Sequence, residues 1–276
     1  MVCEQKYWDL YWPKLADLPE IQELPALPTY KRLKHWFDLE GNIPELHIRK
    51  SRAAYYGLIT FLDELIGGLN DILYETGLDR STVVIYTSDH GEMLGERGLW
   101  WKCCFFDSSA RVPFIIRFPE RSIKGKRIEK VASLVDLTAT ILEIAGIDVP
   151  DYMRGNGMLN LLKGNGTEWK DMAFSEYLAH GTDRPQCSLR KGRYKLNYSL
   201  NESFELYDIE KDPDELNNLG EENNYNDIIQ SMFSEINKFW NGEEINKKVL
   251  LSQHIRSHFP YQKSRLSDYM KSIHSD

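Results

Sequence analysis

The sequence predicts an α/β fold, in which helices pack on a largely parallel sheet and a small antiparallel sheet with one helix follows near the C-terminus. A long helical pattern over residues 50–76 leads by a short turn into a continuous apolar run at 82–87. This succession is typical of a parallel sheet that is buried on both faces. Two further β-type runs, at 191–196 and 204–208, lie near the C-terminus, and we expect them to pair as an antiparallel sheet.

Each of the remaining elements rests on a local pattern. The helix at 50–76 has apolar residues at three- and four-residue steps, and Gly77 gives it a C-terminal stop. A second short strand is expected at 113–118, where a β-type run ends at a proline. Residues 133–146 predict a second helix, which begins at a serine or aspartate cap and ends at a glycine. An apolar stripe over 228–240 predicts a helix that follows the antiparallel sheet.

The pattern of the sequence changes from alternating helix and strand signals to short β-type runs after a glycine-rich passage that ends near residue 166. We expect residues 1–166 to form the larger α/β part. Residues 167–276 are expected to form a small α+β subdomain and a polar tail.

Composition argues against several classes of partner. The chain has 276 residues, with 34 Lys and Arg against 42 Asp and Glu, and a formal net charge of −8. Because phosphate binding needs a basic face, this balance argues against a nucleic-acid partner. The apolar runs are too short to cross a bilayer, so no membrane partner is expected, and the absence of a signal segment predicts a cytoplasmic location. Four cysteines are too few for a disulfide scaffold, which indicates free thiols.

The most informative stretch follows the expected strand at 82–87. Asp89 and His90 come directly after it, and ligands of open α/β sheets bind outside the carboxyl ends of the strands. An adjacent carboxylate and imidazole can both face one metal ion there, with Gly91 allowing a sharp turn. We expect the loop to bring Lys102 back to the same rim, where a metal and an ammonium would cradle sulfate or phosphate. The alternative is that the pair only caps and hydrogen-bonds the loop.

These residues carry a family resemblance. Residues 88–91, the glycine-rich loop after them, Trp101-Lys102 and the run 111–116 are similar to the second metal motif of the sulfatase family, within the alkaline phosphatase superfamily. The order and spacing match over roughly residues 1–240. Further similarities, to the family's late core helix and its small C-terminal sheet, lie at 135–140, 190–195 and 205–219.

The resemblance implies part of an alkaline-phosphatase-like core and a sulfuric ester hydrolase. It assigns Asp89 and His90 to a divalent metal, with Ca²⁺ expected and Mn²⁺ or Mg²⁺ as alternatives, and Lys102 to contact with a sulfate ester or related anion. Residues 7–11, 98–102 and 176–182 are similar to the choline-sulfatase-like branch. Phosphonate monoester hydrolases share the Asp-His-Gly and Lys pattern, so a phosphonate or phosphodiester hydrolase stays open as an alternative.

The nucleophile that the resemblance implies is not encoded here. Sulfatases of this type use a formylglycine made from Cys or Ser in the motif C/S-x-P/A-x-R, which does not occur in the sequence. Cys187 comes nearest, but it lacks the Pro or Ala and has its arginine one position early, so we reject it. The family's paired-Asp metal motif and its middle-region Lys and His are also missing. The chain therefore resembles the C-terminal half of a sulfatase, and we expect it to be inactive alone.

The sequence also suggests roles for the other charged residues of the loop, a route to self-association and a non-catalytic alternative. Glu92, Glu96 and Arg97 are interpreted as solvated structural residues of the loop, and Arg111 as a support that pairs with a carboxylate. An incomplete sheet would expose an edge through which the protein could self-associate. A third hypothesis is that the chain is a non-catalytic metal- or partner-binding remnant of the sulfatase scaffold.

Overall fold

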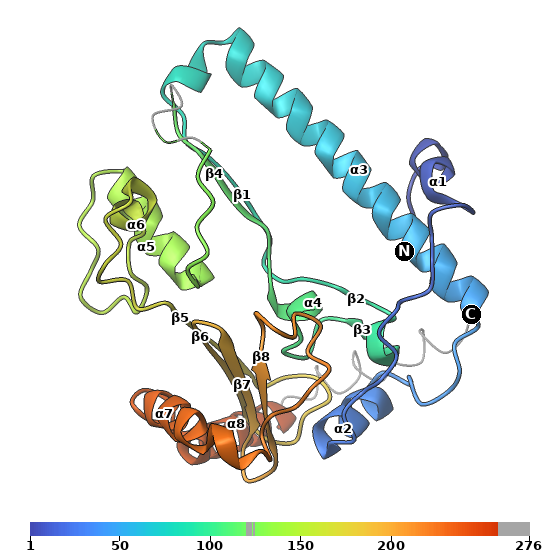
Figure 1. The fold of residues 1–276 in the computed structure, drawn as a ribbon. Helices are drawn as coiled ribbons and strands as arrows, with labels where there is room; N and C mark the ends of the chain where they lie inside the picture. The colour runs from blue at the N-terminus through green and yellow to red at the C-terminus, as the bar shows by residue number, and fades with distance from the viewer. Residues whose placement is uncertain (120–122, 124, 259–276) are drawn as a thin grey trace.

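The computed structural model describes residues 1–119, 123 and 125–258. Figure 1 shows a long helix and a pair of strands that extend away from a C-terminal sheet and its helices. The α-helices are α1 Gln5–Tyr11, α2 Pro28–Trp36, α3 Glu45–Glu75, α4 Asp107–Ala110, α5 Leu134–Ile144, α6 Leu159–Lys163, α7 Asn226–Asn237 and α8 Gly242–Ser257. The strands are β1 Val84–Thr87, β2 Met93–Leu94, β3 Trp100–Trp101, β4 Phe114–Arg117, β5 Met172–Tyr177, β6 Gln186–Lys191, β7 Tyr194–Ser199 and β8 Phe204–Asp208.

The mixture of helices and sheets confirms the α/β class, but the predicted parallel arrangement is wrong for the described residues. Strand β1 pairs with β4 in antiparallel fashion, with Val84 opposite Arg117 and Thr87 opposite Phe114. Every other described pairing, β2 with β3 and those within the order β5-β6-β7-β8, is also antiparallel. A continuous apolar run reports that a strand is suited to burial on both faces, but it carries no information on the direction of its neighbour.

Local signals located α3 and α5 well, whereas α1 and α2 were not predicted. Helix α3 begins five residues earlier than predicted, after Pro44, and ends before Gly77, whose φ of 72° is the left-handed conformation typical of a helix stop. Helix α5 begins after Ser133, as its sequence predicts. The Asp136 carboxylate accepts a hydrogen bond of 2.8 Å from the Ser133 backbone N–H, which satisfies one of the amides exposed at the helix start.

The C-terminal sheet is larger than the sequence predicts. The segment 191–196, expected as one strand, instead contains the turn between β6 and β7, because Gly192 adopts a φ of 54° there. Strand β6 was missed because its polar residues mask the pattern. Leu189, Leu196 and Leu206 are fully buried on one face of this sheet and pack against Met232 and Ile236 of α7. This apolar contact holds the predicted C-terminal helix on the sheet.

The opposite face of the C-terminal sheet is polar and yet buried. Gln186, Lys195 and Glu205 point from three neighbouring strands and are each less than 10% exposed. The Tyr30 hydroxyl of α2 donates a hydrogen bond of 2.6 Å to Glu205, and the Gln186 amide donates one of 2.6 Å to Thr29. Desolvation raises the pKa of Glu205, against the hydrogen bonds it accepts. The polar face therefore serves as an interface inside the molecule.

A buried ion cluster lies on this polar face. The Lys195 Nζ atom lies 2.7 Å from Asp107 Oδ1 and 2.6 Å from Glu215 Oε1. Glu215 also accepts a hydrogen bond of 2.6 Å from the Asp107 backbone N–H at the start of α4. Three segments that are distant in sequence are thereby fixed to one another. Because a buried charge without a partner is costly, all three members depend on the cluster.

Helix α8 was not predicted, since its apolar residues follow no clear helical period. Asn241 caps it by accepting a hydrogen bond of 3.1 Å from the Glu244 backbone N–H. Within residues 1–119, 123 and 125–258, no helix combines the length and the apolar character needed to cross a membrane.

The ion cluster gives a stability prediction. We expect Lys195→Met to lower the free energy of unfolding by about 3–5 kcal/mol, because it leaves the buried Glu215 carboxylate and the partly buried Asp107 carboxylate without their shared cation. Lys191→Met is the matched control, since its ion pair of 3.0 Å with Glu235 is partly exposed and should contribute less than about 1 kcal/mol. Urea unfolding followed by circular dichroism measures both. Equal losses in the two variants would contradict a structural role for the cluster.

Candidate active-site loop

The loop between β1 and α4 carries all of the predicted site residues. Asp89 and His90 follow the last residue of β1, and Lys102 follows the last residue of β3. The short β2–β3 pairing, with Met93 opposite Trp101, folds the loop back on itself. Gly91 is required by close approach, because a Cβ there would lie 2.2 Å from the Ser108 carbonyl oxygen. Its φ is not positive, so the expected sharp turn is not the reason for the glycine.

The structure brings Asp89 and His90 together. His90 Nδ1 lies 2.7 Å from the Gly91 carbonyl oxygen. Because a carbonyl can only accept, Nδ1 must carry a proton, and a neutral ring then has a lone pair on Nε2. That Nε2 lies 3.4 Å from Asp89 Oδ2. Nε2 and Oδ2 both carry lone pairs, so their approach is favourable only when a proton or a cation lies between them.

The separation of these two atoms fits neighbouring positions around one cation. Metal–oxygen bonds of about 2.3–2.6 Å at a right angle place their donor atoms about 3.3–3.7 Å apart. Asp89 is largely exposed and His90 is partly exposed, so a cation could reach both. In the described part of the chain, no group of three or more His, Cys, Asp or Glu side chains could share a metal ion. The pair therefore fits two donors of a cation site, with the rest supplied from elsewhere.

The electrostatics of the pair favour an ionised carboxylate. Desolvation raises the pKa of Asp89, but the charge that His90 carries when protonated and hydrogen bonds from backbone N–H groups and Ser88 prevail and lower it. The His90 backbone N–H donates one of these bonds, of 3.1 Å, to Asp89 Oδ1. Asp89 is therefore available as an anionic donor at neutral pH.

Lys102 is exposed and, among the described residues, its ammonium forms no ion pair or hydrogen bond. Glu92 lies on the same loop and is partly buried. Desolvation raises the pKa of Glu92, while the charge that His90 carries when protonated and the charge of Lys102 both lower it.

Arg97 is buried, which corrects the expectation that it is a solvated residue of the loop. This residue is 4% exposed rather than solvated, and its φ is 59°. Its guanidinium donates hydrogen bonds of 2.6 and 2.8 Å to the Asp214 and Glu215 carbonyl oxygens and lies 4.2 Å from the centre of the Phe106 ring. Arg97 therefore fixes the middle of the loop to the segment after β8.

Glu96 and Arg111 are the remaining charged residues for which the sequence predicted a supporting role. Glu96 accepts a hydrogen bond of 2.6 Å from the Leu94 backbone N–H and pairs with Arg52 of α3 at 2.6 Å. Its role is structural, as predicted, but it is partly buried. Arg111 is exposed and pairs with no carboxylate of the described residues, so the expected ion pair is not found. The contribution of this segment is the backbone: the Ser109 carbonyl accepts a hydrogen bond of 2.7 Å from the Gly91 N–H.

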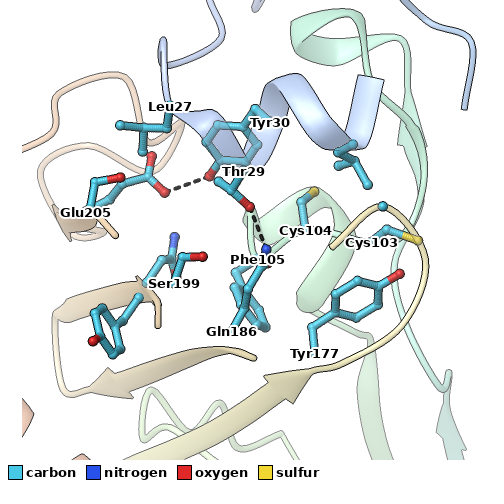
Figure 2. A pocket seen from close by; sticks show the side chains of 15 residues that line it. Leu27, Thr29, Tyr30, Cys103, Cys104, Phe105, Tyr177, Gln186, Ser199 and Glu205 are labelled. Atoms are coloured by element: carbon cyan, nitrogen blue, oxygen red, sulfur yellow. Dashed lines mark hydrogen bonds between the residues drawn. The ribbon is translucent and has the colours of Figure 1, made fainter. Parts of the chain in front are cut away.

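A small cavity lies behind the end of the loop (Figure 2). Cys103 and Cys104 line it together with Tyr177, and the Tyr30–Glu205 and Thr29–Gln186 hydrogen bonds cross its wall. Its volume of about 20 Å³ suits a single water molecule and excludes a tetrahedral oxyanion. The cavity is therefore not where a substrate would bind.

Cys104 and Cys187 are poor nucleophiles. Desolvation raises the pKa of Cys104 to about 12, and it raises that of Cys187, with a further contribution from Glu176, also to about 12. Cys187 is fully buried in the core under α7. Since the thiolate is the reactive form, the structure gives independent support for rejecting Cys187 as a nucleophile.

The residues that support the loop were missed by sequence reasoning. Asp107, Lys195 and Glu215 are separated by up to 108 residues, so no local spacing connects them. The one available signal was the alternation in β7, where polar residues at 195, 197 and 199 mark a single face. Nothing in that pattern shows that the polar face is buried.

Comparison with known proteins places this loop in a family. A family model described as "Sulfatase" matches residues 3–147, and one described as "N-sulphoglucosamine sulphohydrolase, C-terminal" matches residues 95–241. The choline-sulfatase of Rhizobium meliloti is 36% identical over 227 residues, which cover 80% of this chain and 44% of that protein. The arylsulfatase of Clostridium perfringens is 32% identical over 248 residues, covering 86% of this chain and 50% of that protein.

Solved structures agree on the fold. A putative sulfatase from Bacteroides thetaiotaomicron superposes with a TM-score of 0.70 at 23% identity, covering 81% of this chain and 51% of that one. The phosphonate monoester hydrolase of Silicibacter pomeroyi also gives 0.70, at 25% identity, over 82% of this chain and 51% of that one. The chain thus has part of an alkaline-phosphatase-like fold and spans about half the length of the curated relatives it matches. Because a sulfatase model matches more than half of its residues, including the Asp89–His90 loop, the chain belongs to the sulfatase family.

Proposed function

We propose that the protein to which these residues belong hydrolyses sulfuric esters, and that this chain supplies one part of the active site. The single observation that carries the proposal is the Asp89–His90 pair after β1, where Nε2 faces Oδ2 at 3.4 Å within the region that the sulfatase model matches. Family membership supports a sulfatase-type hydrolase. The relatives named choline-sulfatase and arylsulfatase support a small or aromatic sulfate ester as substrate.

The residues of the loop have distinct roles in this proposal. Asp89 and His90 would hold a divalent cation, with Ca²⁺ proposed and Mn²⁺ or Mg²⁺ as alternatives; when bound, the cation supplies positive charge beside the sulfate oxygens. The Gly91 carbonyl keeps the proton on Nδ1, so that Nε2 points toward the carboxylate. Lys102, exposed at the other end of the loop, would bind and orient a sulfate oxygen with its ammonium.

The nucleophile must come from outside these 276 residues, since no C/S-x-P/A-x-R motif occurs in them. Cys104 and Cys187 do not replace it, because burial keeps both thiols protonated. Covalent catalysis and a complete set of charged groups provide most of an enzymatic rate enhancement. We therefore propose that the chain alone is inactive.

A phosphonate or phosphodiester hydrolase is the second candidate. The observation that favours it is the similarity to phosphonate monoester hydrolases from Silicibacter pomeroyi, at 25% identity, and Agrobacterium radiobacter, at 29% identity. The same cation donors and lysine would serve either anion. In a protein that also contains the nucleophile, the ratio of kcat/KM for 4-nitrophenyl sulfate to that for 4-nitrophenyl phenylphosphonate distinguishes the two activities.

The first prediction of this proposal is that the purified chain shows no turnover of choline sulfate or 4-nitrophenyl sulfate, even with Ca²⁺. The physical reason is the missing nucleophile. Assays of sulfate release on the wild type and on Cys187→Ala test it. Metal-dependent turnover that survives Cys187→Ala would reveal an unrecognised nucleophile, and turnover that is lost in Cys187→Ala would show that this thiol reacts. Inactivity in both is the expected result.

The second prediction concerns cation binding. We expect Mn²⁺, a paramagnetic substitute, to bind weakly and to broaden the NMR resonances of the His90 imidazole, because two protein donors leave most positions to water. Asp89→Ala should abolish the broadening at His90, whereas Asp79→Ala, a matched aspartate on the 3₁₀ turn Leu78–Arg80, should not. Broadening that persists unchanged in Asp89→Ala would refute a shared cation position.

A further inference from the structure

Helix α3 carries an apolar stripe that the described chain leaves uncovered. The buried residues of the helix, Ala53, Ala54 and Gly57, all lie in its N-terminal half, beside α1. The stripe consists of Leu58, Leu62, Leu65, Leu69 and Ile72, and all five are exposed, Leu65 and Leu69 to 55% each. Their alternating steps of four and three residues place them on one side of the helix, the pattern of a helix that packs against a partner.

The β1–β4 pair is uncovered in the same part of the molecule. It contains four residues from each strand, and within the described residues no further strand pairs with either edge. Its residues are largely apolar, but none is buried and Ile115 is 62% exposed. A two-stranded sheet is marginally stable on its own, and free edges invite further strands. Figure 1 shows that this pair and α3 both extend away from the C-terminal sheet.

The exposed surface is larger than expected for a compact monomer. The accessible surface is 18192 Å² for 32.3 kDa, whereas a folded monomer of this mass exposes about 12,300 Å². The uncovered apolar side chains of α3 and of the β1–β4 pair lie within this exposed surface.

We propose that the α3 stripe and the edges of the β1–β4 pair bind the complementary part of a sulfatase core, meaning the portion of the relatives' length that this chain does not match. The relatives match 80–86% of this chain, but the match occupies only 44–50% of their own length. The solved structures show the same proportion at a TM-score of 0.70. A complementary portion of similar size, which adds strands to β1–β4 and covers α3, accounts for both the coverage and the exposed surface.

Charge favours this occupant over a second copy of the chain. The part of α3 that carries the stripe, residues 58–75, contains the acidic residues Asp63, Glu64, Asp71 and Glu75 and no Lys or Arg, and of these Glu64 is paired with Lys6 of α1 at 3.5 Å. Two copies that met through this helix would bring the same carboxylates together, which costs binding energy. The partner surface should instead combine an apolar stripe with flanking Lys or Arg side chains. This inference rests on family membership and not on the proposed chemistry.

The test is co-purification, which is independent of activity. The full 276-residue chain, carrying an affinity tag, is co-expressed with the N-terminal part of the Rhizobium meliloti choline-sulfatase up to the start of the matched region; the corresponding part of the Clostridium perfringens arylsulfatase is a second probe. We expect a 1:1 complex with at least one probe. Leu65→Glu with Leu69→Glu should reduce recovery of the probe at least tenfold. Leu250→Glu with Leu251→Glu on α8, at equally exposed leucines, should leave it unchanged.

The outcomes separate the alternatives. Urea unfolding of both double variants verifies that they remain folded, as expected for substitutions at exposed positions. Failure of both probes to bind the wild-type chain would overturn the proposal, as would binding that the α3 double variant does not weaken. A wild-type dimer in sedimentation analysis that the α3 double variant dissociates would assign the surface to a second copy, which also overturns it. If the complex forms but hydrolyses no sulfate ester, the interface stands and the proposed function fails.

Discussion

The contact between Lys195 and the two carboxylates of Asp107 and Glu215 joins the C-terminal sheet to the loop that carries the candidate site. The lysine lies on the polar face of the C-terminal sheet, at 2.7 and 2.6 Å from its partners, and is almost fully buried. A sheet with one apolar and one polar face would ordinarily turn the polar face to water. Here the apolar face binds α7 and the polar face binds the loop that carries the candidate site. The sheet is therefore the support of that loop.

The same contacts position the candidate functional residues of the loop. Asp107 lies five residues after Lys102, and Arg97 lies five residues before it; both are fixed to the Asp214–Glu215 segment through hydrogen bonds. The loop thus has anchored flanks and an exposed lysine between them. At its other end, the Gly91 N–H is bound to the Ser109 carbonyl, which holds Asp89 and His90 near the start of the same unit. Rigid flanks with exposed functional groups are what a preorganised anion site requires.

The sequence predicted those parts that depend on neighbouring residues. Helical periodicity and glycine stops located α3 and α5, and the Asp89–His90–Lys102 motif pointed to the family that the comparisons show. It could not predict strand direction, because an apolar run such as 82–87 indicates only that a strand is suited to burial. It could not connect Lys195 with Glu215 or recognise that Arg97 is buried, because those facts depend on contacts between distant segments. Strand β6 was missed since its inward polar side chains look like those of a solvated strand.

The central claim, that the C-terminal sheet holds the candidate active-site loop in place, is tested most directly by amide hydrogen exchange. The Asp107 N–H, bound to Glu215, and the Arg97 N–H, bound to the Ile21 carbonyl at 2.8 Å, report on the loop, and the amides of Leu189 and Leu196, which are paired on neighbouring strands, report on the sheet. If the loop and the sheet form one cooperative unit, all four amides exchange with the free energy of global unfolding. Exchange of Asp107 and Arg97 at least a hundredfold faster than Leu189 and Leu196 would show that the loop opens independently and would contradict the account.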